Sequence, residues 1–197
     1  MKSLDPAILN GKTIRLEPLR SDLYETVQKA ANDPRLWEVT VVRAYGEYFD
    51  TWWYDAIKGM QQETRLPFAV ISQADQKVIG STSYLNIAIN EQRLEIGSTF
   101  YAHNQWGSKV NPECKLLLMT YAFETLGIRR VEFCVDAINT RSRAAVTKLG
   151  AVQEGFLRCH RNTWSGRRRD TVMFSVVDSE WPKVKQGLQA RSGSPPC

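Results

Sequence analysis

Hydrophobic and polar residues alternate along several short segments of the chain, and a period of two residues predicts half-buried β-strands. In the segment RRVEFCVDA, for example, the alternation places Val131, Phe133 and Val135 on one face. Strands are predicted in this way over residues 11–19, 66–73, 77–88, 94–101, 129–137, 152–163 and 168–178. The turn ADQK joins the second strand to the third, and WSGR joins the last two, so both pairs are predicted to form hairpins.

Between the strands, apolar residues recur at a spacing of three to four, which predicts helices. A helix over 21–33 has Ser21 as a candidate N-cap. A helix over 47–63 has one apolar face, made of Phe49, Trp53, Ile57 and Met60. Further helical segments are predicted over 112–127, 139–151 and 179–188, with Gly127 and Gly150 expected to end the first two.

The order of these elements predicts the fold class. Strands and helices alternate in the middle of the chain and paired strands lie on either side, which indicates an α/β (mixed α+β) domain with one mixed sheet. At 197 residues the chain is long enough for one domain, expected over residues 1–190. The end of the chain is of low complexity, and residues 191–197 are expected to be a disordered tail.

The composition is that of a globular protein, with 43% hydrophobic and 24% charged residues. No apolar run reaches the ~20 residues of a membrane helix, and the N-terminus lacks the apolar core of a secretion signal. We therefore expect a cytoplasmic protein with no membrane partner. The four cysteines form no CxxC pair and only two histidines are present, which argues for reduced thiols and no metal site. The net charge of +5 favours anionic ligands.

The segment HNQWGSKVNPECKLLL, residues 103–118, lies where a predicted strand gives way to a helix. Backbone N–H groups converge at such a junction and the helix dipole favours negative charge, so the junction could bind an anion. Gly107 permits close backbone approach and Lys109 adds a cation. The segment also fits an ordinary loop, because Asn111 followed by proline is a good helix start and Glu113 would repel a phosphate.

The stretch LEIGSTFYAHNQWGSKVNPECKLLLMTYAFETLG, continued by IRRVEFCVDAINTRSRAAVTKLGAVQEGFLR, spans residues 94–158. It resembles the GNAT superfamily of acetyl-CoA-dependent N-acetyltransferases, and within it the branch that acetylates the N-termini of ribosomal proteins. The resemblance extends from Gly11 to Trp181. It implies a GNAT-like acyl-CoA N-acyltransferase fold, with a central, mostly antiparallel sheet of about seven strands and flanking helices. It also implies acetyl-CoA as co-substrate, without a metal.

In that family, backbone N–H groups of the turn after the fourth strand hold the CoA pyrophosphate, within a Q/R-x-x-G-x-G/A pattern. This chain has Trp106, Lys109 and Asn111 at the three patterned positions, but Gly107 keeps the turn flexible. Main-chain donors do not depend on the side chains, so the resemblance implies a modified phosphate cradle. The implied cofactor-binding residues are Thr99, Phe100, Tyr101, Trp106, Gly107, Ser108, Lys109, Val110, Asn111, Asn139 and Ser142.

The resemblance also implies that the strand 94–101 splays from the next strand and offers backbone groups to the pantetheine. A serine at the position of Ser142 is thought to protonate the leaving thiolate in this branch. The tyrosine that many members use instead is replaced here by Val146. Asn139 matches the asparagine that opens the helix, but it is an equally good N-cap, and Ser142 could be an ordinary helical serine.

Candidates for the general base are Glu95 on the fourth strand and His160 on the sixth. The glutamate that related enzymes place just past the sixth strand is replaced by Arg161. His160 could instead be a structural histidine, and Glu95 could pair with an arginine. On the acceptor side we expect His160, Trp164 and Trp52, the last as an exposed residue of the second helix.

The expected reaction is direct attack of an amine on the acetyl-CoA thioester in a ternary complex. The replaced glutamate favours an α-amine, with a pKa of about 8, over a lysine amine at about 10.4, because more of it is neutral at pH 7. A protein or peptide N-terminus is therefore the favoured acceptor. A polyamine, an amino acid or an aminoglycoside is an alternative, as is an acyl-CoA-binding protein without catalysis.

Other partners follow from the charge and from the resemblance. The run Arg167, Arg168 and Arg169 could attract an acidic partner or form a solvated hairpin. A nucleic-acid-binding module is disfavoured because the net charge is modest and acids are numerous. The branch that the chain resembles commonly forms homodimers, so a homodimer is expected to be one possible state.

Overall fold

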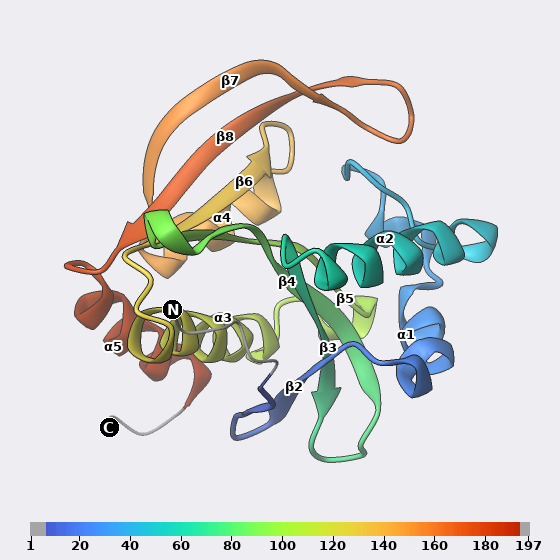
Figure 1. Ribbon diagram of the computed structural model, residues 1–197, viewed down its shortest axis with the longest axis horizontal. Coiled ribbons are helices and arrows are strands. Elements are labelled where there is room, and N and C mark those ends of the chain that lie inside the picture. Colours follow the sequence, from blue (N-terminus) through green and yellow to red (C-terminus); the bar gives the residue numbers. More distant parts are fainter. Residues whose placement is uncertain (1–6, 194–197) are drawn as a thin grey trace.

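The structure, a computed structural model, describes residues 7–193. Within them, eight strands form one sheet in the order β1-β2-β3-β4-β5-β6-β8-β7 (Figure 1). The strands are β1 (Leu9–Asn10), β2 (Ile14–Pro18), β3 (Arg65–Ser72), β4 (Val78–Ala88), β5 (Arg93–Tyr101), β6 (Arg130–Asp136), β7 (Val152–Asn162) and β8 (Arg168–Val177). β5 and β6 are parallel, and all other neighbours are antiparallel. The expected mixed, mostly antiparallel sheet is confirmed.

Helices cover both faces of the sheet. They are α1 (Tyr24–Ala31), α2 (Phe49–Gln61), α3 (Val110–Thr120), α4 (Thr140–Leu149) and α5 (Trp181–Ser192). α1 and α2 pack on one face, in an apolar cluster that includes Phe100 of β5. α3, α4 and α5 share a larger cluster with the other face, and Figure 1 shows α3 and α5 side by side. No helix within residues 7–193 has the length and apolar character needed to cross a membrane.

All predicted strands are present, and the structure adds an eighth. β1 has two residues, paired with β2, and is too short for a hydrophobic period to reveal it. The helical turn predicted over 179–188 is the beginning of a longer helix, because α5 buries Val184, Leu188 and Ser192. Residues 191 and 192 are therefore helical rather than part of a disordered tail, and residues 194–197 lie outside the described range.

The buried face of α2 differs from the predicted one. Its buried residues are Phe49, Trp52, Ala56 and Gly59, while Trp53, Ile57 and Met60 are half-buried. Trp52 is 3% exposed, so the prediction of an exposed tryptophan was wrong. Gly59 lets the helix approach the sheet, since a Cβ there would lie 2.9 Å from the Cβ of Arg65 at the start of β3. Both faces have helical spacing, so packing against the sheet and not the period decides which one is buried.

The start of α3 also differs from its prediction. The helix begins at Val110, before the Asn111–Pro112 pair that was expected to open it. Glu113 in its first turn is 1% exposed. Its carboxylate accepts hydrogen bonds from the backbone N–H groups of Lys12 and Thr13 and from the Thr13 hydroxyl. Glu113 therefore holds the turn before β2 against α3, a role that its local sequence did not indicate.

This contact gives a stability prediction. Glu113→Ala leaves two backbone donors and a hydroxyl without their charged acceptor, so we expect a loss of about 1–3 kcal/mol in the free energy of unfolding. Urea denaturation followed by tryptophan fluorescence measures it. Glu91→Ala is the control: Glu91 pairs with Arg93 at the surface, and we expect a change below ~1 kcal/mol. Equal midpoints for the two variants would contradict the role assigned to Glu113.

Candidate active site

β5 and β6 separate part-way along their length. Their parallel pairing begins at Arg93 opposite Arg130 and ends at Glu95 opposite Glu132. β5 continues to Tyr101 and β6 to Asp136, each paired over this part only with its outer neighbour, β4 or β8. The facing edges beyond Glu95 therefore carry backbone groups without a strand partner, as predicted for residues 94–101.

A β-bulge in β5 accompanies the separation. Ser98 and Thr99 together face a single residue of β4, Thr82. Ser98 has a φ of +47°, in the left-handed region that residues other than glycine rarely adopt. Bulges and strained residues of this kind gather near functional sites, because they re-aim side chains and interrupt pairing.

Glu95 lies where the two strands part. It is 4% exposed, and Oε2 accepts a hydrogen bond of 2.7 Å from Asn86 Nδ2 on β4. Oε1 lies over Gly97, since a Cβ added there would be 2.9 Å away. Burial, and then the charge of the neighbouring Glu95, raise the pKa of the Cys134 thiol on β6 to about 12. No arginine within residues 7–193 forms an ion pair with Glu95, so its carboxylate has no fixed cationic partner among them.

An open cleft of about 360 Å³ adjoins Glu95 on the face covered by α2. Its walls come from α2, the segment after it, β3, β4 and β7, and they include Asp55, Lys58, Arg65, Leu85, Asn86 and Arg161. Asn86 is thus both a wall residue and the hydrogen-bond donor to Glu95 behind it. Figure 1 shows α2 beside this region and the β7–β8 hairpin arching above it.

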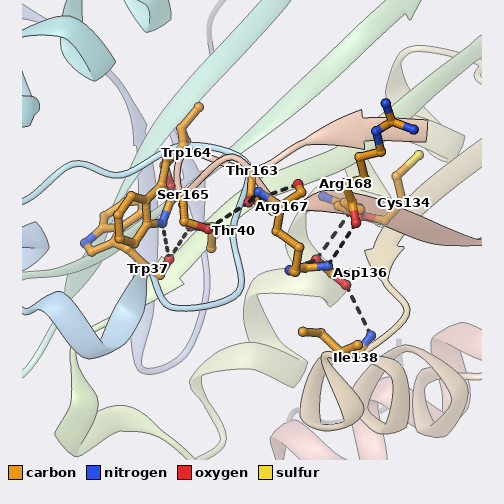
Figure 2. A network of polar contacts seen from close by, with 12 residues as sticks. Trp37, Thr40, Cys134, Asp136, Ile138, Thr163, Trp164, Ser165, Arg167 and Arg168 are labelled. Carbon is orange, nitrogen blue, oxygen red and sulfur yellow. Dashed lines mark hydrogen bonds and ion pairs between the residues drawn. The ribbon is translucent and has the colours of Figure 1, made fainter. Parts of the chain in front are cut away.

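The tip of that hairpin is fastened to the segment between α1 and α2 (Figure 2). Trp164 Nε1 donates a hydrogen bond of 2.7 Å to the backbone oxygen of Trp37. Arg43 stacks on two rings, with its Cζ 3.3 Å from the centroid of Tyr48 and 4.7 Å from that of Trp164. Trp164 is 38% exposed, so a contact between its ring and an acceptor stays a prediction, while its N–H already holds the hairpin in place.

Asp136 of β6 also holds the tip of the hairpin, through Arg167, the last residue of its turn. The Asp136 carboxylate accepts a hydrogen bond of 2.5 Å from Arg167 Nη2 and one of 3.1 Å from Ile138 N (Figure 2). Arg169 Nε lies 4.0 Å from the same carboxylate. Arg167 and Arg169 therefore have Asp136 of this chain as their acidic partner. Neither of the two expectations for them, a solvated hairpin or attraction of an external acidic partner, describes their contacts. Arg168 between them is exposed.

The turn from β5 to α3 presents unused backbone donors. Among the described residues, the N–H groups of Gly107, Lys109 and Asn111 donate no hydrogen bond, while that of Val110 is bonded to Ser108 Oγ at 3.2 Å. Gly107 has a φ of +76° and nothing within 4 Å of the place a Cβ would take. The free donors lie at the N-terminus of α3, where the helix dipole favours an anion. The turn thus fits a phosphate group.

Two side chains of the turn are occupied elsewhere. Trp106 Nε1 donates a hydrogen bond of 3.1 Å to the backbone oxygen of Tyr101. Arg141 of α4 stacks on the Trp106 ring, with its Cζ 3.4 Å from the ring centroid. Lys109 Nζ lies 3.3 Å from the place that a Cβ on Gly193 would take, just beyond the C-terminus of α5. A cation is stabilised there by the helix dipole. The donors available to a phosphate are therefore mainly those of the main chain.

The start of α4 supplies the other predicted group. Asn139 is its N-cap, because Oδ1 accepts a hydrogen bond of 3.0 Å from Ser142 N. Ser142 is half-buried, and its hydroxyl makes no hydrogen bond among residues 7–193. Val146, one turn further on, is 7% exposed and belongs to the core. Ser142 therefore stays the candidate proton donor on this helix.

The side chains of the three residues predicted at the end of β5 have structural contacts. Thr99 Oγ1 is 2.8 Å from Thr82 Oγ1 and accepts a hydrogen bond of 3.2 Å from Lys115 Nζ. Phe100 is 5% exposed in the cluster beneath α1 and α2. The Tyr101 hydroxyl donates to Asn111 Oδ1 at 3.2 Å. Any contact of these residues with a ligand therefore comes from the main chain.

The structure brings Glu95, and not His160, to the strand separation. His160 is exposed on β7 and does not line the cleft, although its neighbour Arg161 does. Arg65, Asn86 and Arg161 were not predicted as site residues, and Arg161 was named only as the replacement for the family's glutamate. No motif links them, since they lie on three different strands and meet only in the folded chain. Within residues 7–193, no three His, Cys, Asp or Glu side chains gather to hold a metal ion.

Comparison with known proteins extends this description. Residues 13–152 match the family described as Acetyltransferase (GNAT) domain. The chain is 32% identical to "Uncharacterized N-acetyltransferase p20" of Bacillus licheniformis, over 58% of this chain and 63% of that protein. It is 30% identical to "Putative ribosomal N-acetyltransferase YdaF" of Bacillus subtilis, over 56% and 60%. A GCN5-related N-acetyltransferase from Brucella melitensis has a TM-score of 0.83 at 33% identity, over 96% of this chain and 86% of that one.

The alignments with the two curated relatives thus span less than two thirds of their length, while the structural match covers almost the whole of this chain.

The surroundings of Cys134 give a pH-dependent prediction. With a pKa of about 12, only ~10⁻⁴ of this thiol is thiolate at pH 8, so we expect iodoacetamide to leave it unlabelled while it labels the exposed Cys159. Labelling of Cys134 is expected to rise with pH and in Glu95→Gln, because that variant removes a neighbouring negative charge. Peptide mass spectrometry measures both. Equal labelling of the two cysteines in the folded protein would show that the site is not buried as described.

Proposed function

The chain belongs to the acetyltransferase (GNAT) domain family, and from this premise we propose that it transfers the acetyl group of acetyl-CoA to a primary amine. The acceptor is a protein or peptide N-terminal α-amine, which attacks the thioester directly in a ternary complex. The separation of β5 from β6 beside the buried carboxylate of Glu95 is the observation that carries the proposal. One region then offers a free strand edge, phosphate donors and a base.

The binding of acetyl-CoA is supported by the turn and by the strand edge. Gly107, Lys109 and Asn111 have free backbone N–H groups for the pyrophosphate. The edge of β5 beyond Glu95 has main-chain groups for the pantetheine amides. Asn139 holds the first turn of α4 in place, which sets the position of Ser142. Acetyl-CoA supplies the activated acyl group, and these residues position it.

The reaction needs two proton transfers, one from the attacking amine and one to the leaving thiolate. The amine nitrogen forms a bond to the thioester carbonyl carbon, and the bond from that carbon to sulfur breaks. Glu95 accepts the proton that the amine loses, directly or through one water. Ser142 donates a proton to the leaving thiolate and regains one from solvent. Free N–H groups along β5 stabilise the negative charge that develops on the carbonyl oxygen.

An N-terminal α-amine is the acceptor that this arrangement suits. Its pKa of about 8 leaves roughly a tenth of it neutral at pH 7, so a single carboxylate base is enough. A lysine amine, at about 10.4, is neutral in well under ~0.1% of molecules at the same pH. The printed name of one relative, a ribosomal N-acetyltransferase, supports the same class of acceptor.

The test is a comparison of two peptides. One has a free N-terminus and no lysine, and the other has a blocked N-terminus and one lysine. We expect release of CoA thiol and acetylation only with the first, measured by a thiol reagent and by mass spectrometry. Faster acetylation of the lysine would overturn the choice of acceptor, and no acetylation of either peptide would overturn the proposed reaction for peptides.

Glu95→Gln is the matching catalytic variant. We expect kcat to fall by ~10²-fold or more at pH 7, and by less at pH 9, where the α-amine loses its own proton. Arg129→Gln, an exposed surface change, serves as the control. An unchanged rate in Glu95→Gln would remove Glu95 from the mechanism.

Lys109→Ala tests how the phosphates are held. Because the ammonium group lies beside the end of α5 and the main chain carries the free donors, we expect the affinity for acetyl-CoA to change by less than about threefold. Isothermal titration calorimetry measures the two dissociation constants. A loss of ~10-fold or more would show that the lysine charge, rather than the main chain, holds the pyrophosphate.

A further inference from the structure

Arg65, the first residue of β3, brings a cation into the cleft beside Glu95. Its Nε donates a hydrogen bond of 3.0 Å to Ser83 Oγ, and Nη2 donates one of 3.1 Å to Ser98 Oγ. The guanidinium carbon lies 5.4 Å from the ring centroid of the buried Trp52. Two hydroxyls and an indole ring therefore fix the guanidinium in one position.

The charge of Arg65 has no partner of opposite sign. Within residues 7–193 no carboxylate forms an ion pair with it. Among the described residues its hydrogen-bond partners are the two neutral hydroxyls, and Nη1 makes no hydrogen bond to any of them. Burial lowers the pKa of this guanidinium to about 10, and the more distant Asp55 offsets only part of that effect. Desolvated cations in proteins are normally paired, so an unpaired one that lines a cleft indicates an anionic ligand.

The charges of the other residues that line the cleft are also mainly positive. Lys58 and Arg161 also line it, and neither forms an ion pair among the described residues. Asp55 is the acidic residue among those that line the cleft. Glu95 lies behind Asn86, and in the proposed reaction it accepts the proton that the amine loses. The cleft therefore repels polycations such as polyamines and aminoglycosides and attracts an acidic acceptor.

The position of Arg65 relates this charge to the reaction. Its guanidinium is bonded to Ser98, the left-handed residue of the bulge, which follows Glu95 by three positions on β5. An anion bound to Arg65 therefore lies beside the strand edge where the thioester is expected. We therefore expect the amine that reacts there and the anionic group to lie a few bonds apart in the acceptor.

Building on the proposed function, we propose that Arg65 recognises a carboxylate of the acceptor. The substrate class is then a primary α-amine that carries a carboxylate within a few bonds. A guanidinium fixed by two hydroxyls presents its remaining N–H donors as a fork, which matches a planar carboxylate. Two kinds of acceptor have this chemistry: a polypeptide with an acidic N-terminal residue, and a free α-amino acid.

The experiment compares acceptors that differ in one carboxylate, with kcat/KM expressed per neutral amine because a free amino acid has a higher α-amine pKa than its amide. The first pair is Asp-Ala-Ala-amide against Asn-Ala-Ala-amide, and the second is free alanine against alaninamide. With wild-type protein we expect kcat/KM to be higher by ~10-fold to ~100-fold for the acidic member of one pair, the range of a hydrogen bond to a charged group. Preference within the first pair assigns a side-chain carboxylate, and preference within the second a free amino acid. Equal rates within both pairs overturn the inference.

Arg65→Gln tests whether this residue causes the preference. We expect the ratio within the preferred pair to fall to about one, mainly through KM, with calorimetric binding of acetyl-CoA unchanged. Arg65→Lys keeps the charge but loses the fork, so part of the preference should remain. Arg168→Gln, on the exposed side of the hairpin, is the control and should keep the full ratio. A full ratio in Arg65→Gln overturns the assignment to Arg65.

A binding measurement on the wild-type protein tests the inference even if Arg65→Gln does not fold. Acetyl-Asp-Ala-Ala-amide and acetyl-Asn-Ala-Ala-amide resemble the reaction products, and calorimetry in the presence of CoA compares their affinities for the wild type without turnover. With acetylalanine against acetylalaninamide as the second pair, tighter binding of an acidic member supports the inference, and equal binding in both pairs overturns it. If the wild type acetylates no amine, the proposed function fails. If it acetylates acidic and neutral amines equally, only the role of Arg65 fails.

Discussion

The separation of β5 from β6 is the constraint on which the rest of the site depends. Two parallel strands that part after a short stretch leave main-chain donors and acceptors unused, which a buried sheet tolerates only where a ligand or water takes them up. The bulge at Ser98 and the buried Glu95 lie at the same point of β5. The free edge, the strained residue and the carboxylate are thus parts of one local arrangement.

Internal pairing decides which charges remain available to a ligand. Glu113 is used by the turn before β2, and Asp136 is used by the two arginines of β8 and the turn before it. Arg65 and Glu95 have only neutral hydrogen-bond partners on the cleft side. Glu113 and Asp136 therefore have structural roles, while Arg65 and Glu95 lie near each other at the cleft without a charged partner among the described residues.

The β7–β8 hairpin arches over the site, and its position is set by two residues of its turn. At its tip, Trp164 is bonded to the backbone of Trp37 and covered by Arg43. At the end of the same turn, Arg167 is bonded to Asp136 of β6. The arch in Figure 1 is therefore held to both neighbouring parts of the fold, which keeps Arg161 at the wall of the cleft.

The sequence by itself determined the strands, most of the helices and the caps at Asn139 and Gly150, because these follow from hydrophobic period and local backbone preference. With the family resemblance it also predicted that the turn after β5 binds phosphate and that Ser142 and Glu95 take part in the reaction, which stay predictions. Only the tertiary structure decided that Trp52 is buried and that Arg65 and Arg161 meet in one cleft. Packing decides which face of a helix is buried and which distant strands come into contact, and no local sequence pattern records it.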